Sequence, residues 1–197
     1  GMFRVRGELP RLFAGTETKD RRYMFYTDGQ QQWLPKAVDD QSEGYFGEKY
    51  SNLTDAGEPA SNTGAAGCSI DYPVFRLADV YLMLAESVLR GGQGASRAEA
   101  LQCVNRVRER AFGNADGDIR AAQLTLKFIL DERGRELYWE CTRRTDLIRY
   151  GLFAGDAYTW QWKGGVADGR ATDSRYNVYP IPAAELSANP NLSNENY

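Results

Sequence analysis

Aromatic side chains in segments without regular periodicity are the residues of this sequence best suited to bind a ligand. Phe, Trp and Tyr make up 12% of the 197 residues, and many lie in stretches rich in Gly, Asp, Gln and Asn. An aromatic ring offers an apolar plate for the C–H face of a sugar, while polar neighbours hydrogen-bond the hydroxyls. The candidate carbohydrate-binding residues are Tyr26, Trp33, Tyr45, Trp160 and Trp162.

Trp33 illustrates both interpretations of these aromatics. It follows Gln30, Gln31 and Gln32, whose amides would form a polar rim around its ring. The alternative is that the loop aromatics pack against helices, and the sequence leaves both interpretations open.

Glu136 and Glu140 place two carboxylates one helical turn apart. A glycosidase needs two carboxyl groups that flank a sugar, about 5 to 9.5 Å apart and usually on different elements. Arg133, Arg143 and Arg144 stand three or four residues from these glutamates, which predicts structural ion pairs instead. The sequence contains no histidine, so His-based triads are also absent. We therefore expect no catalytic residues and no enzyme.

Composition also argues against metal ions, cofactors and nucleic acid. His-ligated zinc is excluded, and the run 114–118 lacks the later Gly and Glu of a calcium loop. Cys68, Cys103 and Cys141 are too widely spaced for a metal knuckle, and we expect them to be buried thiols. The net charge of −3 disfavours a nucleic-acid surface.

No stretch approaches the ~20 apolar residues of a membrane-spanning helix, and no export signal is visible at the start. Gly1-Met2-Phe3 resembles a tag remnant before an initiator Met, so we expect the native N-terminus to be missing.

Helical periodicity begins at Pro73. Residues 75–90 carry two apolar stripes, which predicts a helix covered on more than one side. Ser96 and Glu99 form a capping box that starts the next helix, and Gly113 suits its C-terminal cap. The two helices together predict an αα-hairpin of the tetratricopeptide kind. In the first helix, one apolar stripe is Leu77, Val80, Tyr81, Leu84 and Val88, and the other is Ala78, Leu82, Ala85 and Leu89.

A long third helix is predicted between Thr125 and Gly151, about 39 Å if continuous, although Thr142 and Thr145 allow a break near Cys141. The expected fold is mostly α, with this helix, the hairpin and large irregular segments. Residues 1–72 form an irregular aromatic-rich segment and residues 73–197 a helical region, within one domain that is a piece of a longer protein.

Three segments in a fixed order carry a family resemblance. They are FRLADVYLMLAESVLR (75–90), DERGRELYWECTRRTDLIRYG (131–151) and YPIPAAELSANPNL (179–192). Together they resemble the C-terminal region of the SusD/RagB family of outer-membrane nutrient-binding lipoproteins. Two departures are Gly134, where the family has Arg, and the stretch 141–145, which replaces an aromatic-bearing one.

The resemblance implies an all-helical SusD-like protein at the surface of the outer membrane. Such a protein binds an oligosaccharide or polysaccharide without cutting it and passes it to a SusC-like TonB-dependent transporter. The alternative is a helical protein-interaction module that docks a partner and has no glycan site of its own.

The capping box gives the first test. We expect Ser96→Ala to lower the free energy of unfolding by about 1 kcal/mol, because the first turn loses its side-chain acceptor. Urea titration measures the loss; an unchanged midpoint would place the start of this helix elsewhere.

Overall fold

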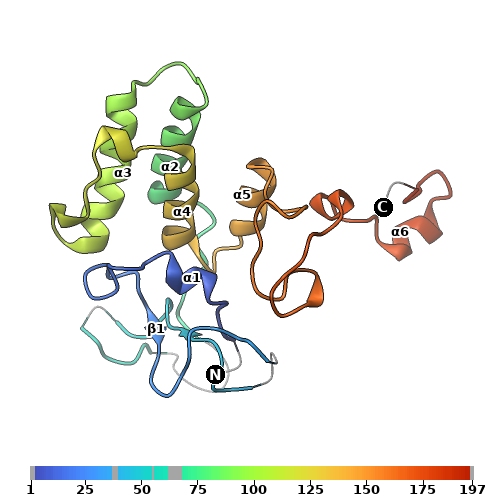
Figure 1. Cartoon of the computed structure of the whole chain (residues 1–197), viewed down its shortest axis with the longest axis horizontal. Coiled ribbons are helices and arrows are strands. Elements are labelled where there is room, and N and C mark those ends of the chain that lie inside the picture. The colour runs from blue at the N-terminus through green and yellow to red at the C-terminus, as the bar shows by residue number, and fades with distance from the viewer. Residues whose placement is uncertain (1–2, 37–39, 55, 62–67, 196–197) are drawn as a thin grey trace.

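The computed structural model describes residues 3–36, 40–54, 56–61 and 68–195 and is mostly helical, as predicted (Figure 1). Over these ranges the only named strands are β1 and β2, which pair antiparallel with Phe25 opposite Gly47. The elements are α1 (Glu8–Arg11), β1 (Phe25–Tyr26), β2 (Phe46–Gly47), α2 (Leu77–Leu89), α3 (Arg97–Phe112), α4 (Leu126–Leu137), α5 (Arg143–Arg149) and α6 (Ala183–Ala188), with 3-10 turns at Ala115–Gly117, Ala121–Gln123, Lys163–Gly165 and Ser174–Asn177.

The ends of α3 lie where the sequence predicts them. The Glu99 amide donates to Ser96 Oγ at 3.2 Å, and Glu99 Oε2 accepts from the Ser96 amide at 2.7 Å. Gly113 ends the helix in the left-handed conformation, with φ of 76°, and its amide donates to the Glu109 carbonyl. The hairpin of α2 and α3 is therefore defined by local signals at its turn and its C-terminus.

The hairpin packs on α4 through a single apolar core. Its buried residues are Leu82, Ala85, Ala100, Val104, Ile119, Leu124 and Ile129. Both predicted stripes of α2 reach this core, because Leu82 and Ala85 are buried in it and Leu84 and Val88 of the other stripe pack against it half-buried. Coverage is incomplete, since Leu77 is 62% and Val80 47% exposed.

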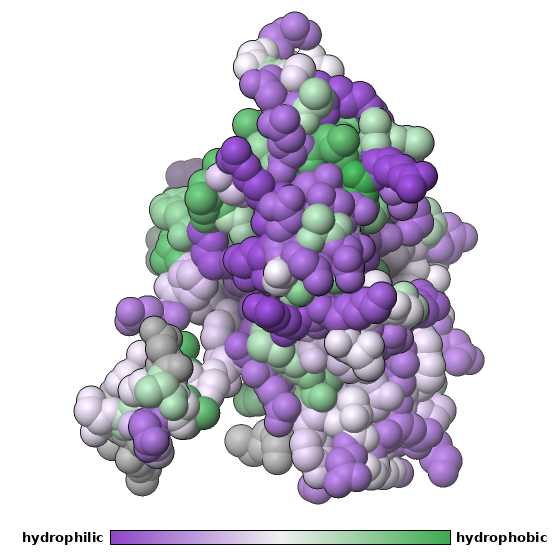
Figure 2. Space-filling view, turned by 90° about the vertical axis from the view of Figure 1, so that its left-hand side faces the viewer, coloured by the Kyte–Doolittle hydropathy of each residue, from purple (hydrophilic) through white to green (hydrophobic). Residues whose placement is uncertain are grey.

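Apolar side chains consequently reach solvent from the helical part of the molecule. The face shown in Figure 2 is mostly hydrophilic, with apolar side chains at the surface in its upper, helical half. Within the described part of the chain, no helix is long and apolar enough to span a membrane.

The predicted long third helix is two helices. α4 ends at Leu137 and α5 begins at Arg143, and between them Trp139 and Cys141 have φ of 63° and 58°. This left-handed region is costly for residues other than glycine. The helix ends here because Tyr138 turns into a second core, where its hydroxyl donates to the Arg22 carbonyl at 3.0 Å.

This second core belongs to the N-terminal segment. Phe13 is fully buried and meets the rings of Tyr23, Phe25 and Tyr138 edge-on, with centroids 5.6, 5.8 and 6.5 Å away. Edge-to-face pairs contribute roughly 0.5–1.5 kcal/mol beyond the area that they bury. A segment with little regular structure is thereby fastened to the end of α4.

A buried network of ion pairs also joins the N-terminal segment to α4. Arg22 donates to Asp20 at 2.7 Å, to Glu132 at 2.8 Å and to Glu136 at 3.1 Å. Its side chain is 6% exposed, and those of Asp20 and Glu132 are not exposed at all. Charges removed from water in this way are tolerated only when they are paired and hydrogen-bonded.

Glu132, on α4, is the most enclosed carboxylate of the network. Besides Arg22 it accepts from Arg108 of α3 and from Arg135, each at 2.7 Å. Burial alone would raise the pKa of Glu132, but the charges of Arg22, Arg135 and Arg108 outweigh it and lower the pKa to about 2. Glu132 is therefore ionised in the folded protein at neutral pH.

Glu136 and Glu140 are ion-paired, as predicted, but not with the predicted arginines. Arg76 pairs with Glu136 at 2.8 Å and with Glu140 at 2.7 Å. Lys49 also pairs with Glu140, and Arg110 lies 2.5 Å from Glu136.

The arginines that were predicted to pair with these glutamates form other contacts. Arg133 pairs with Asp146 at 2.8 Å and with Asp79 at 2.6 Å, while Arg143 and Arg144 donate to backbone carbonyls. For Glu140 the helical spacing does not apply, because α4 ends at Leu137. Arg133 and Glu136 both lie on α4, but Arg133 pairs with Asp79 and Asp146 instead.

The expectation of buried thiols is also wrong. Cys68 and Cys141 are exposed, and Cys103 is partly buried. Cys141 lies in the left-handed reversal between α4 and α5, so its side chain leaves the face on which a continuous helix would have buried it.

The C-terminal segment with α6 extends away from the helical body (Figure 1). α6 begins at Ala183, directly after Pro182. The segment is closed on itself by Asn194, whose amide group exchanges two 3.0 Å hydrogen bonds with the Ile181 backbone.

Two substitutions on α2 separate its buried and exposed faces. We expect Leu82→Ala to cost about 2–5 kcal/mol of unfolding free energy, because it leaves a cavity in the core. Val80→Ala on the exposed face should change it by less than about 0.5 kcal/mol. Urea unfolding of both variants checks this, and similar losses would mean that the exposed face is covered in solution.

The pKa of Glu132 predicts an acid-sensitive fold. Because the pKa falls from its usual 4.5 to about 2 on folding, the unfolded chain binds more protons between those values. The free energy of unfolding should therefore fall as the pH is lowered through this window. The pKa values of Glu86 and Glu140 are lowered too, since their arginine and lysine partners outweigh burial, and they add to the trend.

Urea titrations at pH 6, 4 and 3 measure this loss. Raising the ionic strength should not remove it, because the network is shielded from solvent ions. A free energy of unfolding that stays constant from pH 6 to pH 3 would contradict the assigned pairing.

Candidate functional site

The loop between α5 and the 3-10 turn at Ser174–Asn177 carries two of the five candidate aromatics, Trp160 and Trp162. Lys163, only 2% exposed, holds this loop in shape by donating to the Gly155 carbonyl at 2.8 Å and to the Tyr158 carbonyl at 2.7 Å. Burial lowers the pKa of Lys163, and Asp156 partly offsets the effect. The ammonium group also lies 4.7 Å from the centroid of the Trp160 ring.

Three hydrogen bonds attach this loop to the N-terminal segment. The Gln161 backbone N–H donates to Glu8 Oε1 at 2.9 Å, and the side-chain Oε1 of Gln161 accepts from the Leu34 backbone N–H at 3.0 Å. Trp162 Nε1–H donates to the Leu34 carbonyl at 3.0 Å. Residues separated by more than a hundred positions in the sequence are thus joined around one site.

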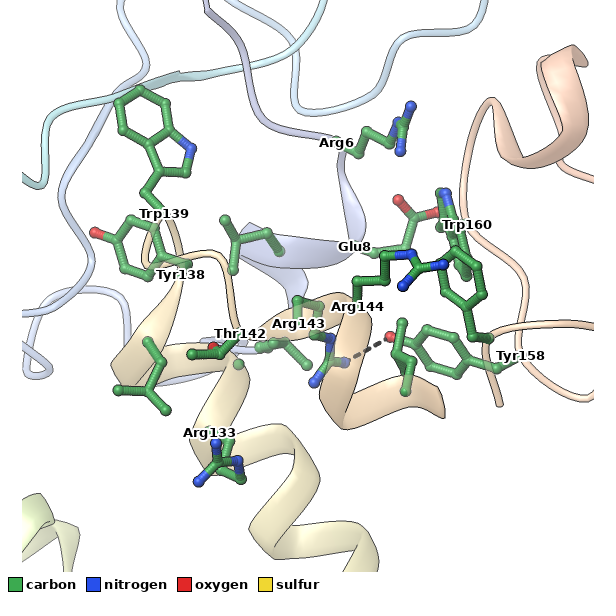
Figure 3. Close-up of a pocket in the computed structure, with 16 residues that line it drawn as sticks. Arg6, Glu8, Arg133, Tyr138, Trp139, Thr142, Arg143, Arg144, Tyr158 and Trp160 are labelled. Atoms are coloured by element: carbon green, nitrogen blue, oxygen red, sulfur yellow. Dashed lines mark hydrogen bonds between the residues drawn. The ribbon is translucent and has the colours of Figure 1, made fainter. Parts of the chain in front are cut away.

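The first cavity at this site has a volume of about 310 Å³ and lies between α1, the end of α4, α5 and the loop. Figure 3 shows Glu8, Arg144, Tyr158 and Trp160 gathered on one side of it. Its lining residues are Arg6, Glu8, Leu9, Leu12, Arg133, Gly134, Leu137, Tyr138, Trp139, Thr142, Arg143, Arg144, Leu147, Phe153, Tyr158 and Trp160.

Gly134 explains how the cavity wall is built. A Cβ atom at this position would lie 2.7 Å from Leu12 Cδ1 and 3.1 Å from Arg143 Nη1. The glycine therefore lets α4 approach the N-terminal segment, and Arg143 can reach across to the Tyr158 hydroxyl at 2.9 Å.

Glu8 supplies an unused hydrogen-bond acceptor to this apolar cavity. Its Oε1 accepts from Gln161, whereas its Oε2 is buried and has no hydrogen-bond partner among the described residues. A buried carboxylate oxygen without a donor is costly, and a ligand hydroxyl would satisfy it.

A second, larger cavity of about 780 Å³ adjoins the first. The two share Arg6, Arg144, Phe153 and Trp160, so the Trp160 ring lies at their boundary. The larger one is further lined by Trp162, Lys163, Gly164, Arg170, Ala171, Thr172, Asp173, Tyr176, Val178 and Tyr179.

The structure brings together Trp160 and Trp162 but places the other three candidates elsewhere. Trp33 is 36% exposed, its ring lies against Gly7, and the Arg11 guanidinium stands 5.6 Å from the ring centroid. Tyr26 of β1 packs on Phe46 of β2, and Tyr45 packs on the N-terminal core.

Several lining residues were not predicted from the sequence. Tyr158 is one of them, although it alternates along the loop with the candidates Trp160 and Trp162, which is a signal that the sequence did offer. Glu8 and Arg144 come from short helical elements far apart in the chain, and no local pattern marks them. Over the described ranges, no group of three or more His, Cys, Asp or Glu residues is placed to hold a metal ion.

Comparison with known proteins identifies the family. A profile described as the SusD family matches residues 14–197. The chain therefore belongs to the SusD family.

Two curated relatives and two solved structures agree with this assignment. The chain is 35% identical over 182 residues to the starch-binding protein SusD of Bacteroides thetaiotaomicron, covering 90% of this chain and 31% of that protein. It is 41% identical over 126 residues to the SusD-like protein P25 of Formosa agariphila, covering 60% of this chain and 22% of that one. It thus spans about a third or less of the length of either relative.

The structural neighbours are SusD superfamily proteins. One from Bacteroides vulgatus superposes with a TM-score of 0.61 over 90% of this chain and 35% of its own length, at 23% identity. One from Parabacteroides distasonis gives 0.64 over 98% of this chain and 42% of its own length, also at 23% identity. At this identity the likeness establishes the SusD-like fold alone.

Proposed function

We propose that this chain binds glycans without cleaving them, as part of a surface protein that delivers them to a transporter. The observation that carries the proposal is the cavity at Trp160, where an aromatic ring and the unpartnered Glu8 Oε2 face one apolar space. Membership of a family in which a curated relative is named for starch binding supports the choice of ligand class.

The site matches the chemistry of a sugar ring. Trp160 is flanked by Phe153 and Tyr158, with ring centroids 5.8 and 6.1 Å away, so it is held as a rigid plate. A pyranose presents C–H groups to such a plate and hydroxyls at its edge. Glu8 Oε2 is an acceptor for one hydroxyl, and Arg144 is a donor to another.

The arrangement of carboxylates supports binding without hydrolysis. A glycosidase needs two available carboxyl groups on either side of the scissile bond. The two cavities hold one each, Glu8 and Asp173, and Asp173 Oδ1 already accepts from the Arg175 amide at 2.8 Å. Glu136 and Glu140 are both engaged by cations.

Delivery of the glycan completes the proposal. A surface lipoprotein of the outer membrane would pass an oligosaccharide or polysaccharide to a SusC-like TonB-dependent transporter. A helical module that binds only a protein partner is not favoured, because it gives no role to the cavities at Trp160.

Trp160→Ala tests the site. We expect it to lower the affinity of this chain for a polysaccharide ligand, seen as retention in a gel that contains the polysaccharide, by about tenfold or more. The substitution removes the stacked aromatic ring, and a loss of about 1.4 kcal/mol of binding free energy is a factor of ten. Affinity electrophoresis across a panel of polysaccharides identifies the ligand, and isothermal titration with its oligosaccharides measures the loss.

Trp33→Ala is the matched control, because Trp33 is a partly exposed tryptophan outside both cavities. It should retain binding. If Trp33→Ala abolishes retention with an unchanged melting temperature while Trp160→Ala does not, the site lies in the N-terminal segment, where Tyr26 and Tyr45 are the neighbouring candidates.

A further inference from the structure

We propose that the larger cavity selects acidic glycans, carrying carboxylate or sulfate groups, over neutral ones. The inference rests on the proposed function and names the ligand class of the same site. The neutral ring would contact Trp160, and the acidic group would meet the arginines of the larger cavity.

The first observation is local charge. The whole chain is acidic, with 27 Asp and Glu against 24 Lys and Arg. The larger cavity reverses this balance, since its lining contains four basic side chains and a single acidic one. A concave surface focuses such a field, so an anion is attracted to this cavity and repelled by much of the remaining surface.

The second observation is that the acidic residue and one basic residue already have structural roles. Asp173 caps the 3-10 turn at Ser174–Asn177 by accepting from the Arg175 amide. The Lys163 ammonium group donates two of its three N–H groups to the Gly155 and Tyr158 carbonyls. The charges that remain to meet a ligand are those of Arg6, Arg144 and Arg170.

Arg144 is fixed in place by groups that do not neutralise it. Its guanidinium carbon lies 4.9 Å from the Phe153 ring centroid and 4.0 Å from that of Tyr179. Its Nη2 donates to the Tyr176 carbonyl at 2.7 Å. Aromatic faces and a carbonyl orient the guanidinium while it keeps its full charge.

Arg170 and Arg6 flank this position. The aliphatic stem of Arg170 lies against Gly164, where a Cβ atom would stand 2.7 Å from Arg170 Cγ. Both side chains are exposed, and within the described part of the chain the carboxylate that acts on Arg6 is that of Glu8 in the first cavity. Figure 3 shows Arg144 beside Trp160, with Arg6 and Glu8 nearby.

This combination fits an acidic sugar better than an unsubstituted one. A guanidinium binds a carboxylate or a sulfate through two parallel N–H donors, and such charge-assisted bonds are roughly twice as strong as neutral ones. Three arginines, of which Arg6 alone has a carboxylate acting on it (that of Glu8), give no advantage to a neutral ring, whose hydroxyls amides would bind equally well.

The experiment compares matched ligands on the same chain. Isothermal titration is run with oligogalacturonate, a sulfated galacto-oligosaccharide, a neutral malto-oligosaccharide of equal length, and an oligoglutamate peptide of equal charge. We expect the acidic glycans to bind about tenfold or more tightly than the neutral one, and their affinity to fall as salt is raised. The stronger of the two acidic glycans identifies the carboxylate or the sulfate as the preferred group.

The variants are Arg6→Gln and Arg170→Gln, with Arg106→Gln as control. Arg106 is an exposed arginine on α3, at the opposite end of the molecule from the loop that carries Trp160 (Figure 1). The two cavity variants should each lower the affinity for the acidic glycan about tenfold and leave any binding of the neutral one unchanged. Arg106→Gln should leave both unchanged, and melting temperatures show whether all three variants are folded.

Other outcomes would overturn the inference. Neutral and acidic glycans binding equally, with no effect of Arg170→Gln, would reject it while leaving the proposed function intact. Oligoglutamate binding as tightly as oligogalacturonate would reject a glycan site in favour of a general anion surface. Failure of every glycan to bind this chain would count against both proposals.

Discussion

The position of Arg22 between the N-terminal segment and α4 is the constraint on which the rest of the structure depends. Its guanidinium joins Asp20 to Glu132 and Glu136, and Glu132 in turn binds Arg108 of α3. These groups are nearly excluded from solvent, so removing one of them would leave an uncompensated buried charge, at a cost of about 3–5 kcal/mol. The network therefore allows a single arrangement of an irregular segment against a regular hairpin.

The geometry of the candidate site at Trp160 follows from the way the N-terminal segment is held against α4. With the N-terminal segment fastened, α1 lies over the end of α4, and Glu8 comes within reach of Gln161 in the loop after α5. The reversal between α4 and α5 turns Tyr138 inward and starts α5 in a new direction, which brings Arg143 to Tyr158. A continuous helix would have carried these residues past the loop.

Sequence reasoning succeeded where the determining interactions are local. The capping box at Ser96 and the left-handed cap at Gly113 depend on residues within a few positions of one another. It was incomplete where they are distant. The sequence allowed a break near Cys141, but the contact that accompanies the end of α4 at Leu137 joins Tyr138 to Arg22, more than a hundred positions earlier, and no periodicity within the helix carries that information.

The same distinction applies to the candidate aromatics. Their composition and their polar neighbours indicate a ligand, but which of them share a cavity depends on how the N-terminal segment meets the later loop. Trp33 illustrates the point, because Leu34 beside it binds Gln161 and Trp162 while the Trp33 ring itself turns onto Gly7. One position along the chain separates a residue that builds the site from a residue that packs outside it.

Charge placement separates two kinds of arginine in this chain. Arg22, Arg108, Arg133 and Arg135 are nearly buried, and each meets at least one carboxylate within 3 Å. Arg144 and Arg170 line a cavity, where Arg144 contacts aromatic rings and a backbone carbonyl and Arg170 lies against a glycine. Paired arginines stabilise a fold because they neutralise buried acids. Arginines held in place without an acid keep their charge available, and that is the property that recognition of an anionic ligand requires.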